Sequence, residues 1–326
     1  MTSLEQGCIE ALNTLKWGNK IDFSKLSNSK NKIFYGTPGT GKSHKVNEII
    51  QTKLERTERV TFHPEYDYAS FVGGYKPSMK DDDIIYEFIP QAFTNIYVRA
   101  WNDLDKDYYL VIEEINRGNC AEIFGDIFQL LDRSNSYAIT PSKELKEYLE
   151  KQFIANINIE GDKMILPPNL NILATMNTSD QSLFPMDSAF KRRWDWEYIP
   201  INDKFSDDNQ SSKFNVILPN DESFSWLEFI LAVNNVIRNN DNLGMDKCLG
   251  NYFIKPENTD IEIEIFINKV VFYLWNDVFK DEIEEHNIFK DKTTYEDFFP
   301  IISNGVNKVK EILELLKVNI IPAQLL

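Results

Sequence analysis

The sequence is poor in cysteine and histidine. Its 326 residues include three of each, and Cys8, Cys120 and Cys248 lie far apart with no paired spacing. Zinc sites and disulfide frameworks need several such residues at short, regular intervals. The sequence therefore predicts neither kind of site, and we expect the cysteines to be buried thiols.

Long apolar runs are also absent. No stretch approaches the roughly 20 consecutive apolar residues of a membrane-spanning helix, and residues 1–20 lack the basic segment followed by an apolar one that marks a secretory signal. We therefore expect a cytoplasmic protein with no membrane contact. Hydrophobic residues still make up 42% of the chain, which is enough to build cores for about two domains.

Basic residues are outnumbered. The chain has 35 Lys and Arg against 51 Asp and Glu, a formal net charge of −16. Such a surface on average repels the phosphate backbone of a nucleic acid. We therefore expect any contact with DNA to be made through a partner or the local lining of a ring, rather than by a dedicated domain of this chain.

The sequence does contain a glycine-rich loop, which directly follows the apolar run 33–35. Residues 36–43 match the complete pattern G-x-x-x-x-G-K-[ST]. In such a loop the main-chain amides surround the β-phosphate of a nucleotide, the lysine reaches the β- and γ-phosphates, and the last hydroxyl can ligate Mg²⁺. The predicted nucleotide-binding residues are Gly36, Thr37, Pro38, Gly39, Thr40, Gly41, Lys42 and Ser43. The alternative, an ordinary glycine turn, is disfavoured by the strand predicted before the loop and the helix predicted after it.

Two carboxylates end the apolar run 108–112. If this run is a strand of a parallel sheet, Glu113 and Glu114 lie at its carboxyl end, where phosphate loops also lie. We assign Glu113 to Mg²⁺ and Glu114 to the activation of the attacking water. A strand that simply ends in solvated acids is the alternative.

A second apolar run ends in an amide. Asn177 follows residues 170–176, and Asp180 lies three positions further on. An amide at this edge can hydrogen-bond the attacking water or the γ-phosphate without changing the charge. Asn177 is equally typical of a turn, but the two preceding motifs favour the catalytic interpretation for Asn177 and Asp180.

Three consecutive cations lie at the end of a short helix predicted within residues 184–194. Alone, such a run is typical of a solvated or helix-capping cluster. In ring-forming nucleotidases a cation at this point reaches the γ-phosphate held by the neighbouring subunit. Arg192 and Arg193 are therefore candidates for catalysis in trans, with Arg117 as a further interfacial candidate.

The rest of the chain is typical of an α/β fold with a parallel sheet covered by helices. The predicted strands are residues 32–35, 59–63, 108–113 and 170–176, and the predicted helices are residues 42–54, 92–102 and 121–131. Insertions are predicted near 73–90, as a hairpin, and 134–168, with a helix at 143–151 and a strand pair. Helical periodicity then dominates, at 226–238, 261–279 and 305–316. We predict an N-terminal helix and linker at 1–29, a nucleotidase domain at 30–200 and a smaller helical domain at 201–326.

Together these blocks resemble the AAA+ family, and within it the McrB branch, the nucleotidase subunits of modification-dependent restriction systems. The resemblance covers about residues 31–279 and is carried by the segments 62–77, 114–117, 176–180 and 243–253. It implies a five-stranded sheet with a helical lid, and Mg²⁺-dependent hydrolysis of GTP in preference to ATP. It also implies a homo-oligomeric ring, usually a hexamer, and an McrC-like endonuclease subunit that inserts into the ring and stimulates hydrolysis.

The sequence departs from that branch at three points. Glu113 stands where the family usually has Asp, and Gln181 stands where close relatives often carry Arg. Residues 1–29 are too short for the domain that reads modified DNA in many members. Two alternatives therefore stay open: a MoxR-like ATPase chaperone that remodels a protein client, and a nucleotide-dependent assembly switch with little hydrolysis.

Overall fold

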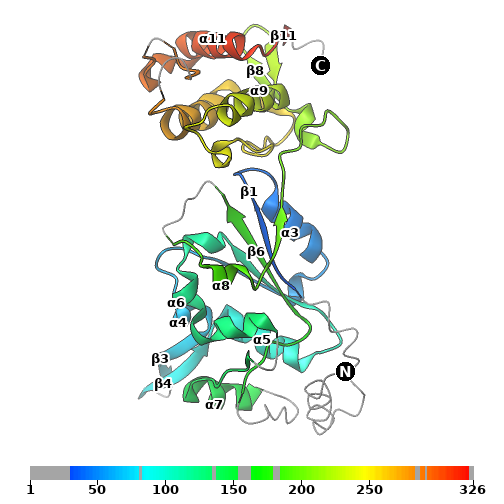
Figure 1. The fold of residues 1–326 in the computed structure, drawn as a ribbon, viewed down its shortest axis with the longest axis vertical. Coiled ribbons are helices and arrows are strands. Elements are labelled where there is room, and N and C mark those ends of the chain that lie inside the picture. Colours follow the sequence, from blue (N-terminus) through cyan, green and yellow to red (C-terminus); the bar gives the residue numbers. More distant parts are fainter. Residues whose placement is uncertain are drawn as a thin grey trace. The chain divides into compact units, whose positions relative to one another are not determined.

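The computed structural model describes residues 30–80, 83–133, 137–152, 163–178, 184–282, 287–290 and 292–322. The helix predicted near the N-terminus lies outside these residues. The chain divides into two compact units, drawn in Figure 1. The first contains residues 30–35, 43–176 and 184–197, and the second contains residues 36–42, 177–178 and 198–322. The phosphate loop and the end of the strand that carries Asn177 thus group with the C-terminal part of the chain.

The first unit is built on a five-stranded sheet in the order β2-β5-β6-β1-β7, in which β5 pairs in parallel with both β2 and β6. The strands are β1 (Asn31–Gly36), β2 (Thr57–Thr61), β5 (Tyr108–Glu113), β6 (Leu170–Asn177) and β7 (Asp195–Tyr198). The helices are α3 (Lys42–Ile50), α4 (Tyr68–Phe71), α5 (Ala92–Asn102), α6 (Cys120–Phe124), α7 (Lys143–Gln152) and α8 (Ser188–Lys191). This architecture confirms the predicted α/β class and its parallel sheet.

Local sequence explains the best-predicted elements. Leu110, Val111 and Ile112 of β5 are all fully buried, as expected for a parallel strand covered on both faces. On α5 the buried residues include Phe93, Ile96 and Ala100, which recur at the three- to four-residue spacing of one helix face. The bounds of both elements match the prediction. The predicted helix 121–131 is instead α6 followed by a 3₁₀ segment, Gly125–Asp132.

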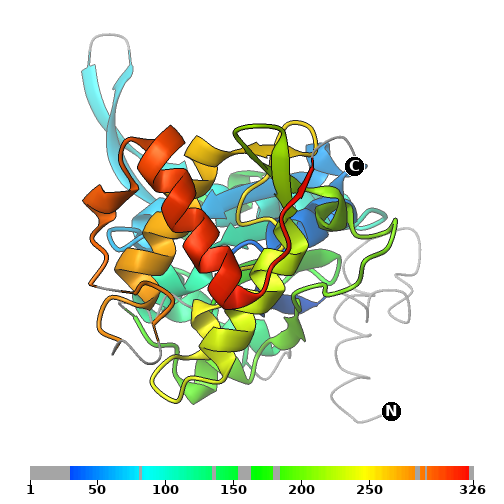
Figure 2. The same ribbon diagram turned by 90° about the horizontal axis from the view of Figure 1, so that it is seen from above.

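Two insertions lie between consecutive strands of this sheet, one between β2 and β5 and one between β5 and β6. The first is a hairpin of β3 (Gly73–Lys80) and β4 (Asp83–Pro90), paired antiparallel along its length and visible in cyan in Figure 2. Gly73 has φ +129°, and a Cβ there would lie 2.6 Å from the carbonyl oxygen of Ile89, so the base of the hairpin requires glycine. The second insertion contains α7 and an antiparallel bridge between Ile139 and Met164.

The second unit combines helices with a small sheet. Its helices include α9 (Trp226–Arg238), α10 (Ile263–Ile265), which continues as π-helical turns through Val278, and α11 (Val306–Leu316). Its sheet has the order β10-β8-β9-β11. The strands are β8 (Asn215–Leu218), β9 (Glu222–Ser225), β10 (Asp260–Glu262) and β11 (Ile321–Pro322).

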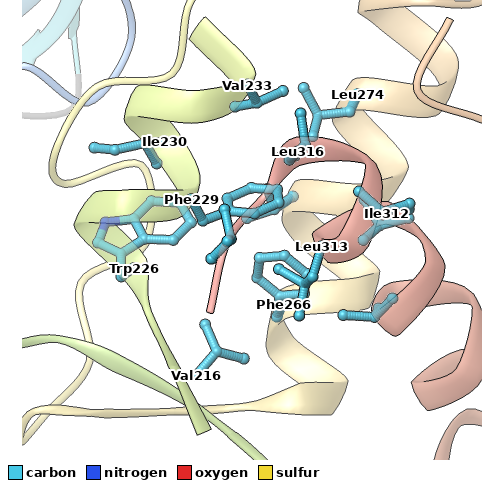
Figure 3. Close-up of a cluster of buried hydrophobic side chains, with 14 of the residues drawn as sticks. Val216, Trp226, Phe229, Ile230, Val233, Phe266, Leu274, Ile312, Leu313 and Leu316 are labelled. Atoms are coloured by element: carbon cyan, nitrogen blue, oxygen red, sulfur yellow. The ribbon is translucent and has the colours of Figure 1, made fainter. Parts of the chain in front are cut away.

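This sheet differs from the prediction, in which the region is helical. The strands are two to four residues long, too short to show an alternating pattern. The predicted helix 261–279 was wrong at its start, because Ile261 belongs to β10. Trp226 and Phe229 of α9 lie in one buried hydrophobic cluster with Phe266 and Leu313 (Figure 3).

Candidate nucleotide site

The phosphate loop runs from the end of β1 to the start of α3, as its motif predicts. Gly39 has φ +80° and Gly41 has φ +94°, values that side-chain-bearing residues rarely adopt. The hydroxyl of Thr40 closes the loop by donating to the carbonyl of Thr37 at 3.1 Å. The glycines of the motif are therefore required by the shape of the main chain itself.

Lys42 is buried within this loop. Its Nζ donates to the carbonyl oxygens of Gly36 at 3.1 Å and Thr37 at 2.8 Å, and only 6% of the residue is exposed. A buried ammonium is tolerated only when it is hydrogen-bonded. The Gly36 carbonyl also accepts from the N–H of Thr178 at 3.1 Å, which ties the start of the loop to the residue after Asn177.

The first unit holds the acidic part of the site. The hydroxyl of Ser43 donates to Glu113 Oε2 at 3.0 Å, and the hydroxyl of Thr175 donates to the same oxygen at 2.5 Å. Arg59 Nη1 lies 3.5 Å from Glu113 Oε1 in an ion pair. That oxygen is buried and, among the described residues, accepts no hydrogen bond. The carboxylate thus retains an oxygen with unused acceptor capacity.

This arrangement fits Mg²⁺. A hard divalent cation prefers carboxylate, hydroxyl and water oxygens, and Ser43 and Glu113 bring a hydroxyl and a carboxylate together with one buried oxygen unsatisfied. The pair predicted from the sequence is therefore close together in the fold. In the described part of the chain, no group of three or more His, Cys, Asp or Glu side chains is arranged to hold a metal ion by itself.

Glu114, the residue after Glu113, has a constrained main chain. Its φ of 53° and ψ of 50° place it in the left-handed region, which costs a non-glycine residue about 1–3 kcal/mol and is often found at functional sites. Its N–H donates to the hydroxyl of Thr175 at 3.2 Å. Thr175 therefore contacts both acids at the end of β5.

Sequence reasoning missed Thr175 and Arg59. Thr175 is 1% exposed and follows Ala174, which pairs with Ile112 across the sheet. A hydroxyl within an otherwise apolar, buried strand is the signal that could have identified it. Arg59 pairs with Val111 across β2 and β5, and nothing in its local sequence distinguishes it from a surface arginine.

The remaining predicted residues differ in what the structure says of them. Asn177 is the last residue of β6, whereas Asp180 and Gln181 lie outside the described residues. Arg192 and Arg117 are exposed. Arg193 is largely buried, with 6% of its side chain exposed.

Arg193 is bound inside its own unit. Its Nη2 and Nε lie 2.6 and 2.8 Å from Asp132 Oδ2, and its Nη1 donates to the carbonyl of Ala189 at 2.8 Å. The guanidinium also lies over the ring of Phe128, 4.1 Å from its centroid. These contacts give Arg193 a structural role, whereas Arg192 is exposed to solvent.

Two cysteines of the described chain are buried, as expected. Burial raises the pKa of the Cys120 thiol to about 12 and also raises that of Cys248. None of the described helices is long and apolar enough to cross a membrane.

Comparison with known proteins identifies the family. The AAA domain (dynein-related subfamily) matches residues 31–194. The type II restriction enzyme BsuMI component YdiS of Bacillus subtilis (strain 168) is 36% identical over 297 residues, which cover 81% of this chain and 84% of YdiS.

A second relative is the type IV methyl-directed restriction enzyme EcoKMcrB subunit of Escherichia coli (strain K12). It is 28% identical over 221 residues, 63% of this chain and 43% of that subunit, so the match spans less than half of the relative. A crystal structure from Cytophaga hutchinsonii aligns over 72% of this chain and 68% of its own at 14% identity, with a TM-score of 0.33. The chain belongs to the AAA domain (dynein-related subfamily) family, in the McrB-like group of AAA+ nucleoside triphosphatases of restriction systems.

Proposed function

We propose that this chain is the motor subunit of a restriction system, in which a ring of Mg²⁺-dependent subunits hydrolyses GTP in preference to ATP and drives a nuclease partner. The observation that supports hydrolysis best is the contact of Ser43 and Thr175 with Glu113, next to a constrained Glu114. Similarity to YdiS over most of both chains supports the restriction system. The ring, the choice of GTP and the cytoplasmic location are predictions from the sequence.

We assign the following roles to the residues. Lys42 neutralises charge on the terminal phosphates, and Ser43 and Glu113 would hold Mg²⁺, which would supply further positive charge to the phosphate oxygens. Glu114 accepts a proton from the attacking water. The hydrogen bond from its N–H to Thr175 holds the main chain from which this carboxylate extends, which reduces the reorganisation that the reaction requires.

Asn177 and Asp180 orient that water in our proposal. The hydrogen bond between Thr178 and Gly36 supports this placement for Asn177, because it joins the end of β6 to the first residue of the phosphate loop. For the cation that acts in trans we favour Arg192, because the guanidinium of Arg193 is engaged by Asp132.

The test is turnover with GTP and ATP side by side, with the mass of the assembly measured in each nucleotide. We expect faster turnover with GTP, a ring that forms with nucleotide, and stimulation when an McrC-like endonuclease subunit is added. Preference for ATP with no stimulation by the nuclease would favour the chaperone alternative. Turnover no faster than that of Glu114→Gln would favour the assembly switch.

A further inference from the structure

The phosphate loop is hydrogen-bonded to a segment far away in the sequence, within the second unit. The N–H of Gly250 donates to the carbonyl of Pro38 at 3.0 Å, and the N–H of Tyr252 donates to the carbonyl of Gly39 at 2.7 Å. Main-chain bonds of this kind do not depend on side-chain rotamers, so they fix the path of both segments. We call residues 250–253 the loop clamp.

Glycines make this approach possible. A Cβ on Gly250 would lie 2.5 Å from both the carbonyl oxygen of Pro38 and the nitrogen of Thr40. A Cβ on Gly39 would lie 2.5 Å from the nitrogen of Phe253. Non-bonded heavy atoms do not approach so closely without displacement of one main chain. The loop and the clamp are therefore packed backbone against backbone, with no space for a side chain.

The clamp is itself anchored through Asn251. Its amide donates to the carbonyl of Asn202 at 2.7 Å and to the hydroxyl of Ser211 at 2.8 Å, and its Oδ1 accepts from the N–H of Asn202 at 2.7 Å. Trp226 Nε1 donates to the carbonyl of Asn251 at 2.8 Å. Asn251 is 2% exposed, and its bonds with Ser211 and Trp226 are buried, where a hydrogen bond is stronger than in water.

Helix α9 anchors the residue before the clamp. Asn234 is fully buried and pairs with the main chain of Leu249, donating to its carbonyl at 2.8 Å and accepting from its N–H at 2.7 Å. An amide side chain that satisfies both main-chain groups of one residue fixes that residue as a strand neighbour would. The clamp is thus connected to α9 on one side and to the 202–211 segment on the other.

We propose that the loop clamp is a positioning element for the nucleotidase reaction, which sets the conformation of the phosphate loop and responds to nucleotide binding through its two main-chain hydrogen bonds to Pro38 and Gly39. Binding of phosphates by the loop amides and Lys42 changes the forces on Pro38 and Gly39, whose carbonyls are bonded to the clamp. Because the packing leaves no space, the loop cannot shift without the clamp. The proposal depends on nucleotide binding and holds for either base and any ring size.

The first test is Gly250→Ala, with Gly74→Ala as the matched control. A Cβ on Gly74 would lie 3.5 Å from Ala69, an ordinary contact, so the control changes the same residue type without a clash. We expect Gly250→Ala to weaken binding of a fluorescent nucleotide by about tenfold or more, to raise KM more than it lowers kcat, and to leave the circular dichroism spectrum unchanged. Wild-type affinity in Gly250→Ala would overturn the proposal.

The second test needs no substitution. Hydrogen exchange at the amides of Gly250 and Tyr252 should slow or quicken when the wild-type protein binds nucleotide, whereas exchange in the hairpin 73–90 should not change. A purely structural clamp would show no response, and that result would also overturn the proposal. The binding measurement of the first test and the exchange measurement of the second are independent of GTP hydrolysis and of ring formation, so a failure of either leaves both readouts valid.

A milder variant covers the case in which Gly250→Ala does not fold. Ser211→Ala removes one acceptor of the Asn251 amide and leaves the loop untouched. We expect it to weaken nucleotide binding by about threefold to tenfold, as for the loss of one buried hydrogen bond. Unchanged affinity in a folded Ser211→Ala protein would count against transmission through Asn251.

Discussion

The hydroxyl of Thr175 on β6 donates a hydrogen bond to the carboxylate of Glu113 on β5. The same hydroxyl oxygen accepts the N–H of Glu114 at 3.2 Å, so a single side chain links the proposed Mg²⁺ ligand with the proposed general base. Parallel pairing of the two strands brings these residues together. A residue outside the recognised motifs thus supports both acids.

The first prediction concerns this link. Thr175→Val keeps the shape of the side chain but removes the hydroxyl, and it leaves the Glu114 N–H without its partner. We expect kcat to fall by about tenfold to a hundredfold while nucleotide affinity changes little, because positioning affects the transition state more than binding. Steady-state kinetics would show this, with Thr175→Ser as the control that restores turnover. Equal kcat in Thr175→Val and wild type would remove the positioning role.

The second prediction separates binding from hydrolysis. Lys42→Ala should abolish nucleotide binding, because it removes the buried ammonium of the loop. Glu114→Gln should bind nucleotide and assemble as the wild type does, while hydrolysis slows by several powers of ten at most. Titration with a fluorescent nucleotide and phosphate release would measure the two effects. A Glu114→Gln enzyme that hydrolyses at the wild-type rate would exclude the assigned role.

The third prediction distinguishes the two neighbouring arginines. Arg193→Ala should destabilise the fold by about 2–4 kcal/mol, because it leaves the Asp132 carboxylate unpaired and removes the stacking on Phe128. Arg192→Ala should leave the melting temperature unchanged, since Arg192 is exposed, and should lower turnover in assembled rings.

Mixed rings test the action in trans. Subunits with Arg192→Ala and subunits with Glu114→Gln should recover part of the activity when combined, because each supplies the group that the other lacks. If rings form and no activity returns, Arg192 does not act on the neighbouring subunit. Thermal melting of each single variant serves as the control for folding.

The fourth prediction follows from the buried thiol of Cys120. Burial holds its pKa near 12, above an ordinary value near 9, so the reactive thiolate is scarce at neutral pH. Iodoacetamide should modify Cys120 at pH 8 only after denaturation. Because the pKa is raised in the folded state, this thiol favours folding below pH 9, and that contribution is lost as the pH rises from about 9 towards 12. Rapid labelling of Cys120 in the native protein at pH 8 would contradict the prediction.

Much of the fold could be predicted because its signals are local. The apolar run of β5 and the helical periodicity of α5 give the observed bounds, since the pattern that specifies each element lies inside it. The strands of the C-terminal sheet could not be predicted in this way. Their pairing depends on contacts between distant segments, such as Asp260 with Asn215.

The candidate site was likewise predictable only in part. The motif of the phosphate loop and the pair Glu113 and Glu114 could be read from the sequence, because their chemistry requires fixed residue types at fixed spacing. The different environments of Arg192 and Arg193 could not, since two adjacent arginines look alike until Asp132 and Phe128 are placed beside one of them.

The sequence by itself determined the family, the phosphate loop and the acids at the end of β5, because covalent order and short-range periodicity encode them. Only the tertiary structure decided that Thr175 joins the two acids, that Arg193 is engaged within its own unit, and that the loop is packed against Gly250. The physical reason is that hydrogen bonds and packing between distant segments depend on burial and strand register, which come into existence only when the chain folds.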